Sequence, residues 1–284
     1  MDASPQAPQL SLVIPAYNEA AVIGLAVAEA EAVLATLCDR FEVLVIDDGS
    51  TDNTAAEVER LLPDAPHTHL LRHPVNRGYG AALRTGFEAA RHELVAFTDA
   101  DCQFDLTDLG DMVRLTGHFP IVAGCRADRK DPWRRRFLSR GYNWLARNLL
   151  GTRLRDVDCA LKVFRREALA HLLPESRGFF VNTEMLTRAR QLGYEVAEVP
   201  VTHRPRLGGM SKVSLWEVPR TLRVLLGFWW KEVLTGPRHR PDPVKVLQVR
   251  LAEPAAVGER SESPRPSSAT GLPAAPRAPR RGAA

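Results

Sequence analysis

The sequence predicts an α/β fold in which a mostly parallel β-sheet is flanked by helices. Short apolar runs alternate with longer helix-like segments along the first hundred residues. The runs lack polar alternation, which is typical of strands covered on both faces. The predicted strands lie at 10–15, 41–46, 69–71 and 94–98, and the helices after them at 20–37, 53–62 and 81–91. This β-α-β-α-β-α-β order favours right-handed, parallel connections.

The remaining chain continues this pattern and then changes in composition. Further strands are predicted at 121–124, 156–164 and 194–201, and further helices at 106–116, 132–150, 182–192 and 215–234. Residues 1–8 are expected to form a disordered leader. The stretch 236–284 is rich in proline, alanine, serine and arginine with little periodicity, so we expect a disordered tail there. A single domain is therefore predicted over residues 9–235.

The composition limits the class of protein. The 284 residues are 45% hydrophobic and 25% charged with a net charge of +4, as in a globular domain. The four cysteines are far apart, which argues against a zinc site or a disulfide framework and favours a reducing, cytoplasmic compartment. The first residues do not resemble a signal peptide, and no apolar run reaches the roughly 18 residues expected of a transmembrane helix.

Basic residues concentrate between residues 126 and 155, where arginines and lysines greatly outnumber acids. Such a zone suggests bound phosphate, anionic lipid or nucleic acid, although a solvated helix face has the same composition. No RNP-like or helix-turn-helix pattern accompanies it, so nucleic acid is not expected as a partner. The helices 132–150 and 215–234 also carry tryptophans beside basic residues, which suits either a membrane surface or ordinary packing on the core.

The apolar run at 94–98 ends in two acids spaced one residue apart, Asp99 and Asp101. Alternate residues of a strand point to the same side, so both carboxylates can meet one ligand. Mg²⁺ and Mn²⁺ prefer such oxygen ligands and commonly bridge carboxylates to substrate phosphates. A single Asp-x-Asp pair is more often a solvated turn, so the other strand ends decide its meaning.

Polar residues follow the other predicted strands as well. They are Tyr17, Asn18 and Glu19 after the first strand, Asp47 and Asp48 after the second, and Arg77 after the third. Ligands of open α/β sheets bind outside these carboxyl ends, where the strand order reverses. Locally, Asn18 is expected to cap the helix from residue 20, and Ser50 or Thr51 the helix from residue 53. Gly78 and Gly80 would let backbone N–H groups approach an anion.

Two later segments carry further candidate chemistry. Asp156 and Asp158 alternate onto one face of the predicted strand 156–164, as a catalytic base or as an ion-pair anchor. Arg206, Ser211 and Lys212 lie in a glycine-containing loop, where they offer a phosphate a guanidinium fork, a hydroxyl and a point charge. Without a ligand, the same segment would be an ordinary surface loop.

Six motifs combine these residues in a characteristic order. They are Val-Ile-Pro-Ala-Tyr-Asn-Glu, Val-Ile-Asp-Asp-Gly-Ser-Thr-Asp, Asn-Arg-Gly-Tyr-Gly-Ala-Ala-Leu, Thr-Asp-Ala-Asp-Cys-Gln, Asp-Val-Asp-Cys-Ala-Leu-Lys-Val-Phe-Arg-Arg and Arg-Leu-Gly-Gly-Met-Ser-Lys. Together they resemble the family-2 glycosyltransferases with the Rossmann-like GT-A fold, over about residues 9–215. The likeness is greatest to polyprenyl-phosphate sugar synthases such as dolichyl-phosphate mannose or glucose synthases.

The resemblance implies a role for each candidate residue. Asp99 and Asp101 would hold the metal and the donor diphosphate, and Gln103 would lie on the donor side. The nucleotide-sugar pocket would comprise Pro15, Ala16, Tyr17, Glu19, Asp47 and Asp48. Groups that grip donor and acceptor phosphates would be Arg126, Arg135, Ser139, Arg206, Ser211 and Lys212.

The implied activity is an inverting transfer of a sugar from a UDP- or GDP-sugar to a polyprenyl phosphate, with Mg²⁺ or Mn²⁺ as cofactor. The protein would act as a peripheral protein on the cytoplasmic membrane face. A lipid phosphate is already ionised and needs positioning rather than a strong base. A hydroxyl acceptor would need a base, for which Asp156 and Asp158 are the candidates. A soluble transferase acting on a hydroxyl and a non-catalytic nucleotide-sugar-binding module remain alternatives.

Overall fold

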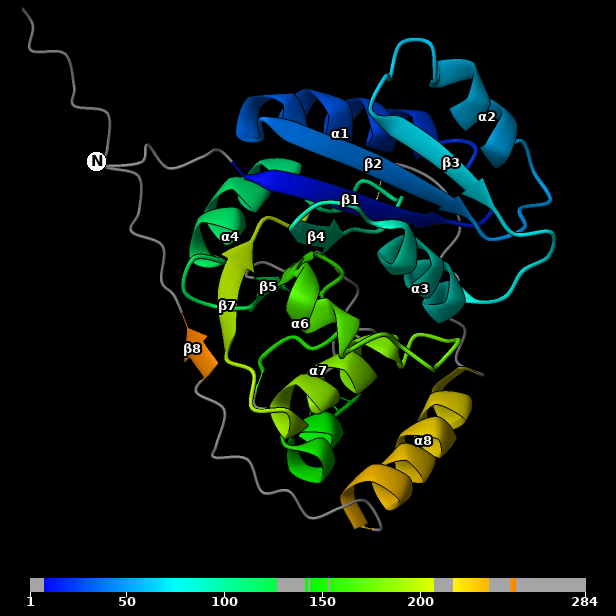
Figure 1. Ribbon diagram of the computed structural model, residues 1–284. Helices are drawn as coiled ribbons and strands as arrows, with labels where there is room; N and C mark the ends of the chain where they lie inside the picture. The colour runs from blue at the N-terminus through cyan, green and yellow to red at the C-terminus, as the bar shows by residue number, and fades with distance from the viewer. Residues whose placement is uncertain are drawn as a thin grey trace, which may run out of the picture. The chain divides into compact units, whose positions relative to one another are not determined.

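The computed structural model describes residues 8–126, 141–142, 144–152, 154–206, 217–234 and 246–248 (Figure 1). The strands are β1 (Gln9–Ala16), β2 (Arg40–Asp47), β3 (Thr68–Arg72), β4 (Leu94–Phe97), β5 (Ile121–Arg126), β6 (Lys162–Arg165), β7 (Val196–Val201) and β8 (Val246–Gln248). The helices are α1 (Ile23–Leu37), α2 (Thr54–Leu61), α3 (Tyr79–Ala89), α4 (Leu109–Leu115), α6 (Arg166–Ala170), α7 (Val181–Gln191) and α8 (Glu217–Phe228). Short helical turns are η1 (Leu106–Asp108), η2 (Ala146–Leu150) and η3 (Trp229–Leu234).

In the described part of the chain, eight strands form one sheet in the order β3-β2-β1-β4-β6-β5-β7-β8. All neighbouring pairs are parallel except those of β6, which runs antiparallel to both β4 and β5. The predicted mostly parallel α/β sheet is therefore confirmed. The chain moves from β1 outward to β2 and β3 and then returns to the other side of β1 with β4. The carboxyl ends of β1 and β4 thus meet at a reversal of strand order, where α/β proteins bind ligands.

Helices cover both faces of the first half of the sheet, which explains its continuous apolar strands. Figure 1 shows α1 and α2 on one face of β1–β3 and α3 on the other. Consecutive residues of β1, from Leu10 to Ala16, are all buried, so side chains of both orientations enter the core. Among them Leu12, Val13 and Ile14 have no solvent exposure at all.

Two segments of the structure differ from the prediction. The strand predicted at 156–164 is limited to β6, Lys162–Arg165, and residues 156–161 are not part of a strand. The common strand face predicted for Asp156 and Asp158 is therefore wrong, because neither residue lies in a strand. The short strand β8 lies inside the range predicted to be a tail and pairs in parallel with β7. Other residues of that range lie outside the described chain.

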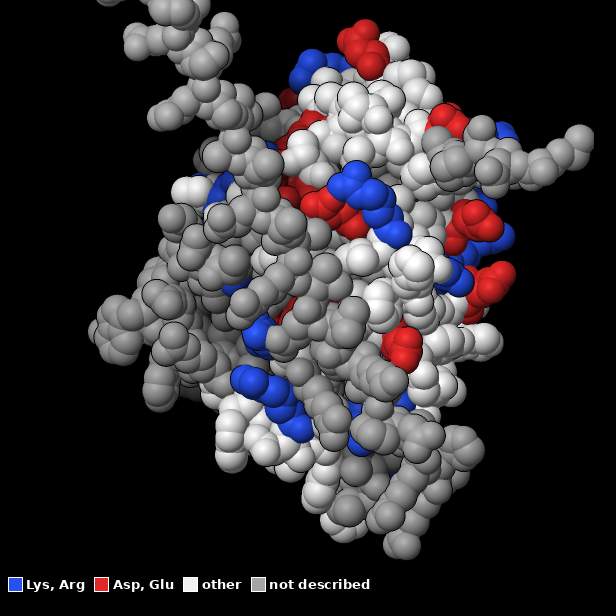
Figure 2. Space-filling model, turned by 90° about the vertical axis from the view of Figure 1, so that its left-hand side faces the viewer, with Lys and Arg blue, Asp and Glu red and all other residues white. Residues whose placement is uncertain are grey.

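The charged and apolar surfaces are unevenly distributed. The face in Figure 2 has acidic side chains near its centre with a basic side chain beside them, and basic side chains are more frequent below. The amphipathic helix α8 buries Leu225 in a cluster with Phe180 and exposes Leu226, and Trp230 in the following turn η3 is exposed as well. None of the helices in the described part of the chain is both long enough and apolar enough to cross a membrane.

A buried polar network joins the amino-terminal ends of β1, β2 and β4. Glu42 accepts hydrogen bonds from the Ser11 hydroxyl at 2.6 Å, and from the backbone N and Nε of Arg91 at 2.8 and 2.9 Å. Burial raises the pKa of Glu42, but these hydrogen bonds outweigh burial and leave the pKa below its ordinary value of 4.5. The ionised form of Glu42 therefore stabilises the fold at pH values above its ordinary pKa, and this stabilisation is lost as the pH falls through the lowered pKa.

Glu42→Gln is expected to lower the free energy of unfolding at pH 7 by about 1.5–3 kcal/mol, because the three hydrogen bonds from Ser11 and Arg91 lose their charged acceptor. Urea unfolding of both proteins at pH 7 and pH 3 measures this difference. The difference should shrink as the pH falls through the low pKa of Glu42, since protonation then removes the same interaction from the wild type. A difference that is the same at both pH values would contradict this explanation.

Candidate active site

The two acids predicted as a metal site lie directly after β4, at the reversal of strand order. Asp101 is only 4% exposed, and its Oδ2 lies 2.6 Å from Nη2 of Arg206. Asp99 is half-buried, and its Oδ1 accepts a hydrogen bond of 2.9 Å from the Tyr79 hydroxyl. Burial, together with the neighbouring charge of Asp101, raises the pKa of Asp99 to about 6. The negative charge of Asp101 thus acts on Asp99 in this site.

Arg206 reaches Asp101 because residues 202–206 run back along the segment that follows the acids. The Arg204 N–H donates to the Gln103 carbonyl at 2.7 Å, and Phe104 and His203 form an antiparallel bridge. The Arg204 guanidinium binds two carboxylates, those of Glu29 at 2.9 Å and Asp105 at 2.6 Å. Contacts with α1 and with residues 103–105 therefore hold the segment that brings Arg206 to the acid pair.

The acid pair fits a divalent cation that shares its ligands with a substrate. Within the described ranges, no three His, Cys, Asp or Glu side chains cluster as a metal site. Mg²⁺ is commonly held by one or two carboxylates together with substrate phosphates, rather than by a complete protein cage. Asp99 and Asp101 match this donor set. The negative charge of Asp101 raises the pKa of Asp99, and a bound cation would offset that effect. These two residues would hold the ion.

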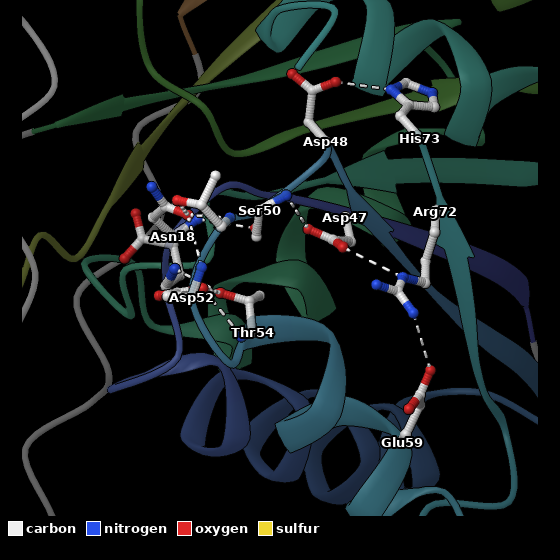
Figure 3. A network of polar contacts seen from close by, with 11 residues as sticks. Asn18, Asp47, Asp48, Ser50, Asp52, Thr54, Glu59, Arg72 and His73 are labelled. Atoms are coloured by element: carbon white, nitrogen blue, oxygen red, sulfur yellow. Dashed lines mark hydrogen bonds and ion pairs between the residues drawn. The ribbon is translucent and has the colours of Figure 1, made fainter. Parts of the chain in front are cut away.

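The loops after β1 and β2 are locked together on the side predicted to bind the nucleotide (Figure 3). Asn18 has a left-handed backbone, with φ of 51°, and its N–H donates to the Ser50 hydroxyl at 2.9 Å. Its side-chain oxygen accepts from the Thr51 N–H at 2.8 Å, and the Glu19 N–H donates to the Thr54 hydroxyl at 2.8 Å. The rim of the predicted pocket is thus pre-formed by the protein itself.

These contacts overturn the predicted helix caps. The helix α1 begins at Ile23 after Val22, which makes no side-chain cap, rather than at residue 20 after Asn18. Asn18 and Ser50 bind the neighbouring loop across more than thirty residues and are not available as local caps. The backbone amide of Thr54, the first residue of α2, instead donates to Asp52 at 3.0 Å.

Asp47 and Asp48 are both almost completely buried and are held by loop atoms (Figure 3). Asp47 accepts from the Ser50 N–H at 3.0 Å. Asp48 accepts from His73 Nδ1 at 2.7 Å and from the backbone N–H groups of Arg77 and Gly78 at 2.9 and 2.8 Å. The predicted anion at this glycine loop is therefore the protein's own Asp48. Contacts of the two acids with a nucleotide stay a prediction.

Asp156 forms the ion pair that the sequence left as an alternative to a catalytic base. Its two oxygens lie 2.6 and 2.8 Å from Nε and Nη2 of Arg126, and both side chains are buried. Burial alone lowers the pKa of Arg126, but the hydrogen bonds and charge of Asp156 outweigh it and raise that pKa. Glu198 of β7 supports this pair by accepting from the Asp156 N–H at 3.1 Å. A catalytic role of Asp156 would require breaking the pair, and a role of Asp158 stays a prediction.

Lys162, the first residue of β6, is a buried charge that the sequence analysis missed. Its ammonium donates to the Val157 carbonyl at 3.1 Å, to the Cys159 carbonyl and to Asn182 Oδ1 at 3.2 Å. It also lies 5.4 Å from the centre of the Phe97 ring, and burial lowers its pKa. A lysine among apolar strand residues is the sequence signal that could have revealed it.

Other predicted residues have a known position but an untested role. Pro15 and Ala16 are buried at the end of β1, Tyr17 is half-buried, and Gln103 is 9% exposed beside Asp101. Arg135, Ser139, Ser211 and Lys212 lie outside the described residues.

Gly80, near the start of α3, packs directly against the segment 175–179. A Cβ at this position would lie 1.9 Å from the Ser176 carbonyl oxygen, so Gly80→Ala is expected to cost about 1–3 kcal/mol of unfolding free energy. Gly24, at the matching position in α1, has its nearest side chain at an ordinary 3.5 Å. Gly24→Ala should therefore stabilise the helix by up to about 1 kcal/mol. Thermal unfolding compares the two, and equal melting temperatures would contradict the close packing at Gly80.

The sequence is similar to known proteins over most of its length. Residues 11–173 match the family described as glycosyl transferase family 2. The chain is 35% identical over 242 residues to the glycosyltransferase AglD of Haloferax volcanii, covering 78% of this chain and 37% of AglD. It is 32% identical over 214 residues to an undecaprenyl-phosphate 4-deoxy-4-formamido-L-arabinose transferase of Sodalis glossinidius, covering 74% of this chain and 64% of that protein. The chain therefore spans less than two thirds of either relative.

A solved structure shares the fold. Glucosyl-3-phosphoglycerate synthase from Mycobacterium tuberculosis, in complex with Mn²⁺, UDP and glucosyl-3-phosphoglycerate, superposes with a TM-score of 0.58 at 23% identity. The match covers 79% of each chain.

Proposed function

The chain belongs to glycosyltransferase family 2, and from that premise we propose that it transfers a sugar, with inversion, from a nucleotide-diphosphate sugar to a polyprenyl phosphate. The observation that carries the proposal is the pair Asp99 and Asp101 at the strand reversal, with Arg206 bound to Asp101 at 2.6 Å. Acids and a guanidinium meet there, at the end of the sheet where α/β proteins bind ligands, which suits a diphosphate sugar.

The donor leaves as a nucleoside diphosphate, so the site must stabilise negative charge. Arg206 lies on Asp101, where the diphosphate would bind, and so offers a positive charge at that point. Mg²⁺ or Mn²⁺ held by Asp99 and Asp101 would supply Lewis-acid stabilisation of the leaving group when bound. The related fold solved with Mn²⁺ and UDP supports this choice of cofactor and donor class.

A phosphate acceptor suits the site better than a hydroxyl. The buried candidate base, Asp156, is engaged on both oxygens by Arg126, and an ion-paired carboxylate is a poor proton acceptor. A polyprenyl phosphate is already ionised and needs only to be positioned for in-line attack. The similarity to an undecaprenyl-phosphate 4-deoxy-4-formamido-L-arabinose transferase supports the same acceptor class. Arg135, Ser139, Ser211 and Lys212 are the proposed further phosphate contacts.

A lipid acceptor implies contact with a membrane surface. Trp144 and Trp230 are 61% and 62% exposed, and Leu226 of α8 is exposed as well. The basic residues Arg223 of α8 and Lys231 of η3 are also exposed. Exposed tryptophans beside basic residues suit the headgroup region of an anionic membrane. We therefore propose that the protein acts peripherally, on the cytoplasmic face of a membrane.

A two-step experiment tests this function. UDP-, GDP- and dTDP-sugars are first screened with Mn²⁺ by thermal shift, since a donor that binds the folded protein raises its melting temperature. The selected donor is then incubated with undecaprenyl phosphate or with undecaprenol. We expect sugar on the phosphate lipid only. Transfer to the alcohol or to free sugars would instead support the hydroxyl-acceptor alternative, and donor binding without any turnover would support a non-catalytic module.

A further inference from the structure

Asp99 has a hydrogen-bond partner that the proposed reaction does not yet use. The hydroxyl of Tyr79, the first residue of α3, donates to Asp99 Oδ1 at 2.9 Å. Among the residues that the structure describes, no other hydrogen bond to the Asp99 carboxylate is found. The contact therefore fixes one oxygen of Asp99, while Oδ2 receives no hydrogen bond from the described residues.

Tyr79 is itself held by the segment 175–179. Its ring stacks on Phe179, with ring centres 5.6 Å apart and an angle of 30° between the planes. The next residue, Gly80, donates its backbone N–H to the Arg177 carbonyl at 2.9 Å. The start of α3 is thus pressed against this segment through both a ring and the backbone.

The segment 175–179 is anchored in turn by Glu184 of α7, which is 1% exposed. The two oxygens of Glu184 accept the backbone N–H groups of Glu175 and Ser176 at 2.9 and 2.8 Å. Arg188 pairs with the same carboxylate at 3.2 Å, which compensates its buried charge. A continuous path of short contacts therefore runs from α7 to Asp99.

We propose that Tyr79 is a positioning residue for the proposed transfer: its hydroxyl turns Asp99 so that the second oxygen faces the metal and donor diphosphate. The terminal torsion of an aspartate is broad, so a carboxylate without a fixed partner samples many orientations. A hydrogen bond from a rigid tyrosine removes that freedom before the ligand arrives. This role rests on the proposed function, because it needs a ligand at Asp99.

The test measures binding of Mn²⁺ together with UDP, GDP or dTDP, using the nucleoside diphosphate that stabilises the wild type most. Tyr79→Phe should weaken this binding about 10–100-fold, as the loss of a group that orients a metal ligand does, while the melting temperature without ligand changes little. Tyr194→Phe is the matched control, because it removes a tyrosine hydrogen bond of 2.7 Å to His171 elsewhere on the protein. This control should bind as the wild type does.

A double-mutant cycle separates positioning from a general structural effect. Tyr79→Phe should have no further effect on binding when Asp99 is already replaced in Asp99→Asn. Additive losses in the double variant, or unchanged binding in Tyr79→Phe, would overturn the role of Tyr79 while leaving the proposed function intact. A wild type that binds none of the three nucleoside diphosphates with Mn²⁺ would overturn the proposed function and this role together.

Discussion

Asp101→Asn is expected to lower kcat/KM for sugar transfer about 10²–10³-fold, the usual effect of removing one preorganised group that stabilises transition-state charge. Asparagine keeps the size of the side chain but removes the negative charge that binds Arg206 at 2.6 Å and that would hold the cation. Initial rates of transfer to polyprenyl phosphate at several Mn²⁺ concentrations measure the effect. Higher Mn²⁺ should restore little of the rate.

Asp111→Asn provides a matched control for Asp101→Asn. Asp111 also pairs with an arginine, Arg114, but on the exposed surface of α4. Exposed pairs of this kind are worth little, so the control should keep the wild-type rate. An Asp101→Asn protein that transfers sugar as fast as this control would contradict the proposed mechanism.

The second large effect is expected on stability. Asp156→Ala leaves the guanidinium of Arg126, only 9% exposed, without its carboxylate, and breaking a buried pair in this way costs about 3–5 kcal/mol. Urea unfolding gives the loss directly. The exposed pair of Asp111 and Arg114 is again the comparison, where Asp111→Ala should change stability by less than about 1 kcal/mol.

The double replacement of Arg126 and Asp156 sharpens this prediction. Replacing both by apolar residues, as Arg126→Met with Asp156→Leu, removes the uncompensated charge and should recover much of the loss. An Asp156→Ala protein as stable as the wild type would show that the ion pair does not stabilise the fold. A double variant less stable than Asp156→Ala would show that the cost comes from packing rather than from charge.

The strands that the sequence predicts best are those with continuous apolar runs. Residues 10–15 and 41–46 fall within β1 and β2, because two covered faces leave no room for polar side chains. The antiparallel insertion of β6 between β4 and β5 had no such signal. Strand order depends on contacts between distant segments, and apolar periodicity reports only the faces of one segment.

The site was predictable as a set of strand ends but not as a set of contacts. The acids Asp99 and Asp101 follow a buried strand and could be recognised locally. The partners Tyr79 and Arg206 are 20 and 105 residues away from them in sequence, so no local pattern connects them.

The helix caps fail for the same reason. Asn18 and Ser50 are residue types that often cap helices. Here they are hydrogen-bonded to each other between two loops, and local propensity cannot predict such a contact.

The central claim is that Asp99 and Asp101 hold a divalent cation against the diphosphate of the donor. Anomalous diffraction from crystals grown with Mn²⁺ and the selected nucleoside diphosphate tests it most directly, because it locates the ion itself. The account predicts one strong Mn²⁺ peak within bonding distance of the Asp101 carboxylate and of the diphosphate, beside Asp99. A bound nucleotide whose Mn²⁺ peak lies away from both carboxylates would contradict it.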